Sequence, residues 1–299
     1  MISAVFYTSG TTGSGRIIRG ISIGNAIKRN GIALEYTILS SSKFGYFADK
    51  FGLNHIEVPI EHENLLTSDI YRKSVLFTTL QSLNPDILIV DLQWFTLAKF
   101  IEEFSFRKIF LCTHLNTKES ADLFLNIPLS TAKKLHFNPA HYDLIVKAEP
   151  TAFPIAGITL NPLIMRNKDE ILTREDASRY LGLNPEDKNC LFAINGKPGE
   201  YENSVKTYSY LEDEGYHMVY STNYKGGIFP AVDYFNTFDL LITGGGYNAF
   251  WEAQYFKKEA LFIPVPRQFE DQKKRIDECS GMTFKENGAD QLVDIMMNL

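Results

Sequence analysis

Short apolar runs alternate with segments of helical periodicity along the first half of the chain. The apolar runs, each predicted to form a buried strand, are residues 2–7, 33–39, 86–90, 108–112 and 142–147. Apolar side chains recur with roughly helical spacing from Ile17 to Ile27, and Gly31 ends this predicted helix. A second, strongly apolar helix is predicted over residues 95–104. Strands that alternate with helices favour parallel pairing through right-handed crossovers, and therefore a doubly wound sheet.

The alternation restarts after a stretch rich in proline and glycine that runs from Glu149 to Pro162. We therefore place a domain boundary near residue 158, which gives domains at 1–158 and 159–299. The elements predicted in the second domain are a helix at 174–181, strands at 190–194, 217–220, 240–242 and 261–263, and a final helix at 289–297. The predicted fold class is α/β, with two doubly wound parallel-sheet domains.

Composition narrows the class of protein. The 299 residues are 44% hydrophobic and 22% charged, which is enough to bury a large core. The net charge of -6 argues against a nucleic-acid binder, which needs a basic face. Three distant cysteines, Cys112, Cys190 and Cys279, form neither a disulfide framework nor a metal-binding pair. This cysteine usage fits a reducing cytoplasm best. No apolar run approaches the roughly 20 residues that span a bilayer, so any membrane contact would be peripheral.

A glycine-rich loop follows the first predicted strand, with Gly10, Gly13 and Gly15 preceding the helix. Its spacing is that of a P-loop, but Arg16 replaces the lysine and Ile17 replaces the hydroxyl that would hold magnesium. A dinucleotide-binding fingerprint would need a third glycine three residues after Gly15, but residue 18 is isoleucine. The alternative that this loop is only a tight strand-to-helix turn stays open.

A second glycine-rich loop, Gly244 to Gly246, separates the strand at 240–242 from a helix that carries Glu252. Glycines let the backbone approach a ligand closely, and a helix N-terminus favours negative charge. This loop therefore predicts an anion site, and we expect the anion to be a phosphate group.

The residues around both loops resemble one enzyme family. The segments 239–253 and 263–272 look like the C-terminal half of inverting GT-B glycosyltransferases, and are closest to family 28, which contains the peptidoglycan N-acetylglucosaminyltransferase. The segments 13–27 and 85–91 are similar to the first loop and a central strand of the N-terminal half. The resemblance implies two Rossmann-like domains facing across a cleft, with a nucleotide-sugar donor held mainly by the C-terminal domain.

The resemblance also assigns donor contacts. It places the donor diphosphate, without a metal, on Gly244, Gly245, Gly246 and Asn248. It gives Glu252 the ribose hydroxyls, and it gives the donor sugar to Arg267, Asp271 and Gln272. The nucleobase would lie near the stretches 195–199 and 220–223. The alternative is that Glu252 and the charged run from residue 270 to residue 275 are only solvated helix faces.

The acceptor side departs from the family. In the N-domain loop of Gly13, Ser14, Gly15 and Arg16, relatives commonly carry histidine where Arg16 stands. Arginine stays protonated and cannot act as the general base for an attacking hydroxyl. Asp91 and His114, at or just beyond predicted strand ends, are the remaining candidates for that base, and Ser14 is a candidate for orienting the acceptor.

The resemblance implies a metal-independent, inverting glycosyltransferase without a further cofactor. It would transfer a sugar from a nucleotide-diphosphate donor, which we expect to be a UDP-sugar, to a hydroxyl of an unknown acceptor. Peripheral membrane contact would follow if that acceptor is a lipid. Two alternatives stay open: a nucleotide-sugar hydrolase or epimerase on the same scaffold, and a non-catalytic nucleotide-sugar-binding subunit.

Overall fold

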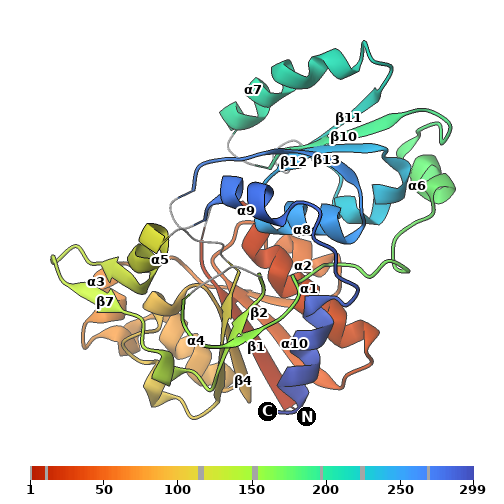
Figure 1. The fold of residues 1–299 in the computed structure, drawn as a ribbon. Helices are drawn as coiled ribbons and strands as arrows, with labels where there is room; N and C mark the ends of the chain where they lie inside the picture. The colour runs from red at the N-terminus through yellow and green to blue at the C-terminus, as the bar shows by residue number, and fades with distance from the viewer. Residues whose placement is uncertain are drawn as a thin grey trace. The chain divides into compact units, whose positions relative to one another are not determined.

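The computed structural model describes residues 2–10, 13–113, 118–149, 154–195, 198–222, 226–267 and 270–299. The chain forms two compact units, and each is assembled from separate segments (Figure 1). The first unit contains residues 1–163, 267–271 and 288–299, and the second contains 164–266 and 272–287. The C-terminal helix thus belongs to the first unit, whereas the predicted domains are contiguous in sequence.

The strands of the first unit are β1 (Ile2–Thr8), β2 (Leu34–Ser40), β3 (Asn54–Glu57), β4 (Ile87–Asp91), β5 (Arg107–Cys112), β6 (Asn126–Pro128), β7 (Lys134–His136), β8 (Leu144–Lys147) and β9 (Ile158–Thr159). Its helices are α1 (Gly15–Arg29), α2 (Tyr46–Asp49), α3 (Glu63–Thr67), α4 (Val75–Leu83), α5 (Lys118–Leu125) and α10 (Gly288–Met297). The second unit contains strands β10 (Asn189–Ala193), β11 (His217–Ser221), β12 (Leu240–Gly244) and β13 (Glu259–Ile263), and helices α6 (Arg174–Leu181), α7 (Pro198–Tyr208), α8 (Tyr247–Tyr255) and α9 (Gln272–Cys279).

A seven-stranded parallel sheet organises the first unit, in the order β3-β2-β1-β4-β5-β8-β9. The chain moves outward from β1 in one direction to β2 and β3, and then in the other direction to β4 and β5. The carboxyl ends of β1 and β4 therefore flank the position where the strand order reverses, which is where open α/β sheets bind ligands. The short strands β6 and β7 form a separate antiparallel pair.

Both faces of this sheet are covered by apolar side chains, as expected for a parallel sheet. On one face, Val5 and Val90 belong to a buried cluster that includes Leu76 and Leu80 of α4. On the other face, α1 approaches the strands so closely that a Cβ at Gly20 would lie 2.8 Å from Phe6 Cδ1. Helix α10 packs against α1. A buried core thus holds the carboxyl ends of the strands in place.

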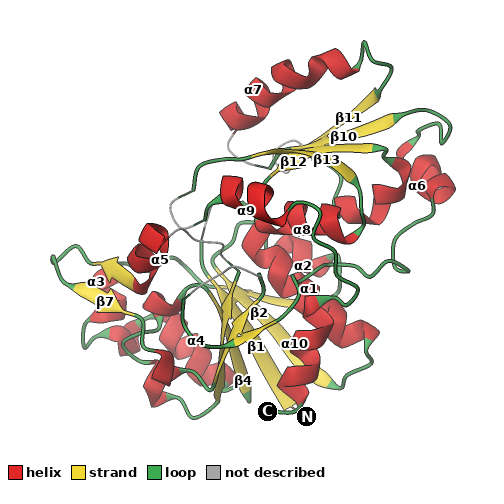
Figure 2. Cartoon of the chain, in the orientation of Figure 1, coloured by secondary structure: helices red, strands yellow, loops and turns green. Residues whose placement is uncertain are grey.

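The second unit is built on a four-stranded parallel sheet in the order β11-β10-β12-β13. Its strand order reverses between β10 and β12. Helix α7 covers one face, where Tyr201 and Val205 pack against Phe192 and Ile242, while α8 and α9 lie on the other side (Figure 2). These two parallel sheets confirm the predicted α/β fold class.

One predicted element is wrong. Residues 95–104 do not form an α-helix; the connection from β4 to β5 contains two short 3₁₀ turns at Trp94–Thr96 and Ile101–Glu103. A 3₁₀ turn also returns side chains to the same face every three residues, so Trp94, Leu97 and Phe100 all enter the core. Apolar spacing alone does not separate these two geometries. Among the described residues, no helix is long and apolar enough to cross a membrane.

Candidate functional site

The glycine-rich loop of the second unit joins β12 directly to α8. Gly244 ends the strand, and Gly246 precedes the first residue of the helix with an extended backbone. The N–H of Gly245 donates to the Ile263 carbonyl at 3.0 Å and so continues the pairing of β12 with β13. The N–H groups of a first helical turn point past the helix N-terminus, and those at the start of α8 follow Gly246. The first turn of α8 contains no acidic residue that would repel an anion.

The three glycines of this loop are needed for different reasons. A Cβ at Gly245 would lie 2.9 Å from Ile276 Cδ1 and 3.3 Å from Gln272 Cβ, so a side chain there would have to displace side chains of α9. A Cβ at Gly246 would lie 3.7 Å from Gln272 Nε2, which is ordinary contact. A Cβ at Gly244 would meet nothing within 4 Å. The space beside Gly244 is therefore open to a ligand, whereas the space beside Gly245 is filled by the protein.

Helix α9 supports the glycine-rich loop. The side-chain carbonyl of Gln272 accepts a hydrogen bond from the Val265 N–H at 2.9 Å, which leaves its amide nitrogen directed toward Gly246. Arg275, which is fully buried, donates to the Gly245 carbonyl at 2.8 Å. The sequence interpretation missed Arg275. Its position one helical turn after Gln272, on the same helix face, is the signal that could have identified it.

Glu252 lies on α8, six residues after Gly246, in a site that disfavours its charged form. The residue is partly exposed, but burial of its carboxyl group, together with the nearby charge of Asp233, raises its pKa to about 8. A hydrogen bond from the Met165 N–H acts in the opposite direction. Asp233 itself is paired with Arg166 at 2.8 Å. Hydroxyl groups that donate to this carboxylate would stabilise its charged form.

Only some of the residues predicted to contact the donor belong to the same compact unit. Gly244, Gly245, Gly246, Asn248 and Gln272 lie in the second unit, together with Glu252. Arg267 and Asp271 belong to the first unit. Of the predicted nucleobase region, residue 195 follows β10, residues 198 and 199 begin α7, residues 220 and 221 end β11, and residue 222 follows it. Residues 196, 197 and 223 lie outside the described residues.

Asp91 is the last residue of β4 and is fully buried at the position where the strand order of the first unit reverses. Both of its carboxylate oxygens are engaged by Arg19 of α1, with the shortest contact 2.7 Å from Nη2. The Thr8 hydroxyl, at the end of β1, donates to the same carboxylate at 3.1 Å. Asp91 is therefore part of a buried ion pair that the sequence interpretation did not foresee.

Arg16 lies one helical turn before Arg19 on α1 and donates to the Ser9 carbonyl. Burial lowers the pKa of its guanidinium, with Asp91 acting in the opposite direction. The side chain of Ser9 is in turn hydrogen-bonded to Ser41, with 3.0 Å between the two Oγ atoms. Arginine keeps its charge in proteins, so the structure places a cation at the end of β1.

The other predicted residues of this loop form the start of α1. Ser14 is the N-cap residue of α1, makes no side-chain capping bond, and accepts the Ile18 N–H at its carbonyl at 3.1 Å. Gly15 is the first residue of the helix, and Gly13 has a φ of +77°, a left-handed conformation that favours glycine. His114, the other candidate base, lies outside the described residues.

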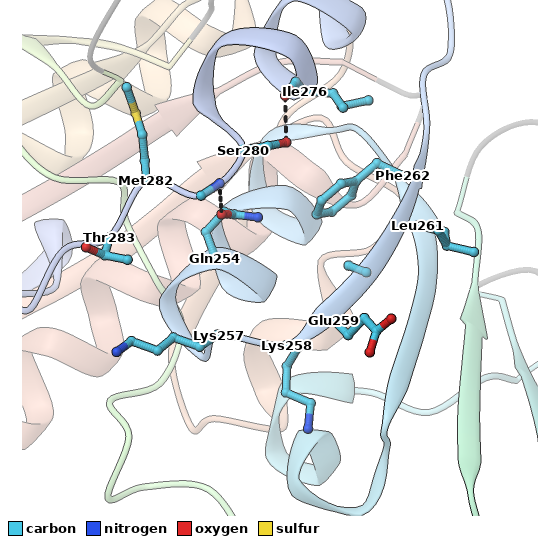
Figure 3. A pocket seen from close by; sticks show the side chains of 12 residues that line it. Gln254, Lys257, Lys258, Glu259, Leu261, Phe262, Ile276, Ser280, Met282 and Thr283 are labelled. Atoms are coloured by element: carbon cyan, nitrogen blue, oxygen red, sulfur yellow. Dashed lines mark hydrogen bonds between the residues drawn. The ribbon is translucent and has the colours of Figure 1, made fainter.

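A cavity of about 610 Å³ lies elsewhere in the second unit (Figure 3). It is bounded by β13 and by the C-terminal ends of α8 and α9, where Gln254 Oε1 accepts the Gly281 N–H at 2.8 Å. The cavity shares no residue with the predicted donor site. Among the described residues, no group of three His, Cys, Asp or Glu side chains is placed to hold a metal ion.

Comparison with known proteins identifies the fold. No protein-family model and no curated protein matches the sequence. Solved structures of glycosyltransferases match the whole chain. SsfS6 of Streptomyces sp. SF2575, complexed with thymidine diphosphate, shares 12% identity over 100% of this chain and 96% of that chain, with a TM-score of 0.59. MurG of Acinetobacter baumannii shares 10% identity over 100% and 91% of the two chains, with a TM-score of 0.56.

A plant enzyme shows the same likeness. UGT2 of Phytolacca americana, complexed with UDP-2-fluoro-glucose and pterostilbene, shares 12% identity over 100% of this chain and 90% of that chain, with a TM-score of 0.54. These matches show that the chain has the GT-B fold of nucleotide-sugar glycosyltransferases, and they confirm the expected fold. At 10–12% identity the likeness concerns the fold, and the activity has to be argued from the site.

Proposed function

We propose that the protein is a glycosyltransferase that uses a nucleotide-diphosphate sugar as its donor. The observation that carries this proposal is the loop before α8: the space beside Gly244 is open, and the helix N-terminus next to it has no acidic residue in its first turn. A diphosphate matches the charge and the hydrogen-bonding groups of such a site. The fold supports the proposal, because similar structures contain thymidine diphosphate or a UDP-sugar analogue.

The remaining donor contacts are proposed on the same basis. Glu252 accepts hydrogen bonds from the ribose hydroxyls, and the amide nitrogen of Gln272 donates to the donor from beside Gly246. Asn248, Arg267 and Asp271 are proposed as further contacts to the diphosphate and the sugar. Transfer is proposed to be inverting, as in the family that the sequence resembles. It is also proposed to be independent of metal ions, since the helix N-terminus would stabilise the leaving diphosphate.

The experiment is a thermal-shift screen of UDP, TDP, GDP and ADP and of their sugar derivatives, with and without a chelator. A ligand that binds only the folded protein raises the melting temperature, so one nucleotide should raise it selectively and the chelator should not remove the effect. Glu252→Gln should abolish the shift, whereas Glu259→Gln, on the exposed start of β13, should retain it. If no nucleotide raises the melting temperature of the unsubstituted protein, the proposed function is wrong.

A specific observation keeps the non-catalytic subunit as a second candidate. Asp91, a predicted candidate base, is held in an ion pair by Arg19. A protein that binds one nucleotide sugar, but neither transfers nor hydrolyses it with any acceptor class, would support that candidate. Release of free sugar at a rate that no acceptor changes would instead favour a hydrolase.

A further inference from the structure

The polar groups at the carboxyl ends of β1 and β4 are unsuited to removing a proton from a hydroxyl. Thr8, Arg19 and Asp91 are each at least nine-tenths buried, and Asp91 accepts from both other side chains. A base must offer a free lone pair to the acceptor and must tolerate protonation. Protonation of Asp91 would remove the negative charge from its buried ion pair with Arg19, which is strongly unfavourable.

Two arginines of α1 lie near the carboxyl ends of β1 and β4. Arg16 and Arg19 both lie in the first two turns of α1, whose N-terminus adds a partial positive charge, and the first turn of this helix contains no acidic residue. Two carboxylates act on Arg16: Asp91, which is already paired with Arg19, and Glu270, whose influence is the weaker. The charge of Arg16 is therefore only partly compensated.

The guanidinium of Arg16 is also fixed in position. It donates to the Ser9 carbonyl and lies against Gly10, where a Cβ would be 2.7 Å from Nη1. Gly10 has a φ of +140°, and its N–H donates to Ser41 Oγ at 2.9 Å. A guanidinium carries five N–H donors in a rigid planar fork, and the bond that Arg16 makes to Ser9 among the described residues uses one of them. The fork matches the geometry of a carboxylate or a phosphate.

From this arrangement we propose that the acceptor of the transfer reaction is an oxyanion, a carboxylate or a phosphate monoester, bound by Arg16. This inference rests on the proposed glycosyltransferase function and specifies its substrate class. An oxyanion attacks without a general base because it carries no proton to remove. Its oxygen forms a bond to the anomeric carbon while the bond from that carbon to the β-phosphate oxygen breaks. The electron pair leaves with the nucleoside diphosphate, and no proton is transferred.

The test uses the donor identified by the nucleotide screen and a panel of carboxylic acids, phosphate monoesters and the alcohols matched to them in size. We expect transfer to one anionic class and no transfer to the matched alcohols. A carboxylate yields a glycosyl ester that hydroxylamine cleaves, whereas a phosphate monoester yields a glycosyl phosphodiester that hydroxylamine leaves intact. The two sources of the oxyanion are thereby distinguished.

The role of Arg16 is tested with the acceptor found in this panel. Arg16→Gln should raise the acceptor KM about 10-fold to 100-fold with little change in the donor KM, and Arg16→Lys should restore part of the affinity. Arg72→Gln is the matched control, because Arg72 is an exposed arginine of the same unit. Above the acceptor's own pKa, the rate should not depend on the titration of a protein group.

Three results overturn the proposal: transfer only to alcohols, no transfer to any anion by a protein that binds the donor, or an unchanged acceptor KM in Arg16→Gln. Retained activity in His114→Asn supports it, because an oxyanion needs no imidazole base. Failure to bind any nucleotide is a different outcome, and it refutes the proposed function itself. The two failures are therefore separable.

Discussion

Replacing Glu252 with glutamine should stabilise the protein while it removes nucleotide binding. Burial raises the pKa of this carboxyl group from 4.5 to about 8, with Asp233 adding to the effect. At neutral pH, folding therefore keeps a proton on Glu252 that the unfolded chain releases. Glutamine has almost the same shape and no charge, so it avoids this cost. It also loses the carboxylate that we propose for the ribose hydroxyls.

The direction and size of this stability change follow from the linkage between protonation of Glu252 and folding. Below about pH 4.5 both states are protonated and Glu252 has no effect on the free energy of unfolding. Between about pH 4.5 and 8 only the unfolded state loses its proton, so the free energy of unfolding falls as pH rises. The difference between the two pKa values corresponds to about 5 kcal/mol at most. Because the residue is partly exposed, we expect a gain of about 1–3 kcal/mol above pH 8.

The assay is urea unfolding of the unsubstituted protein, Glu252→Gln and Glu259→Gln at about pH 5, 6.5 and 8, followed by nucleotide titration of each folded protein. The stability gain of Glu252→Gln should grow with pH, and the Glu259→Gln control should show no such growth. An identical pH dependence in all three proteins would refute the electrostatic reasoning. A Glu252→Gln protein that binds nucleotide normally would refute the ribose contact, whatever its stability.

Two further predictions follow from the same structure. Asp91→Asn removes the carboxylate that pairs with the buried guanidinium of Arg19 and should lower the free energy of unfolding by about 3–5 kcal/mol in a denaturant titration. A loss below about 1 kcal/mol would contradict a buried pair. Gly245→Ala should cost about 1–3 kcal/mol in the same assay, because its Cβ would lie 2.9 Å from Ile276 Cδ1. Gly244→Ala should change the free energy of unfolding by no more than about 0.5 kcal/mol but weaken nucleotide binding. Equal losses of stability in Gly244→Ala and Gly245→Ala would contradict the open space beside Gly244.

Much of the fold could be predicted because its signals are local. The strands at 240–244 and 259–263 are short apolar runs bounded by turn residues, and the glycines at 244–246 mark the junction with α8. The segment at 95–104 shows the limit of this method, since its three-residue apolar spacing fits both an α-helix and the 3₁₀ turns that form. What resolves that ambiguity is packing against the sheet, which the segment itself does not encode.

The candidate site could likewise be predicted only in part from the sequence. The sequence indicated Glu252 and the glycine-rich loop, but it could not show that the Gly245 N–H is already used by Ile263. It could not show that Arg19 reaches Asp91, a residue 72 positions away, because that pairing depends on the parallel placement of β1 beside β4. The resemblance pointed to a missing histidine at Arg16, and only the structure shows how that arginine is held.

By itself, the sequence determined the α/β class, the order of most strands and helices, and the positions of two glycine-rich strand-to-helix junctions. Periodicity and turn chemistry depend on neighbouring residues, so they can be recognised without coordinates. The tertiary structure decided which polar groups are paired, which glycine faces open space, and how far burial shifts the pKa of Glu252. Those properties depend on groups that are distant in sequence and on exclusion from water, and they exist only once the chain has folded.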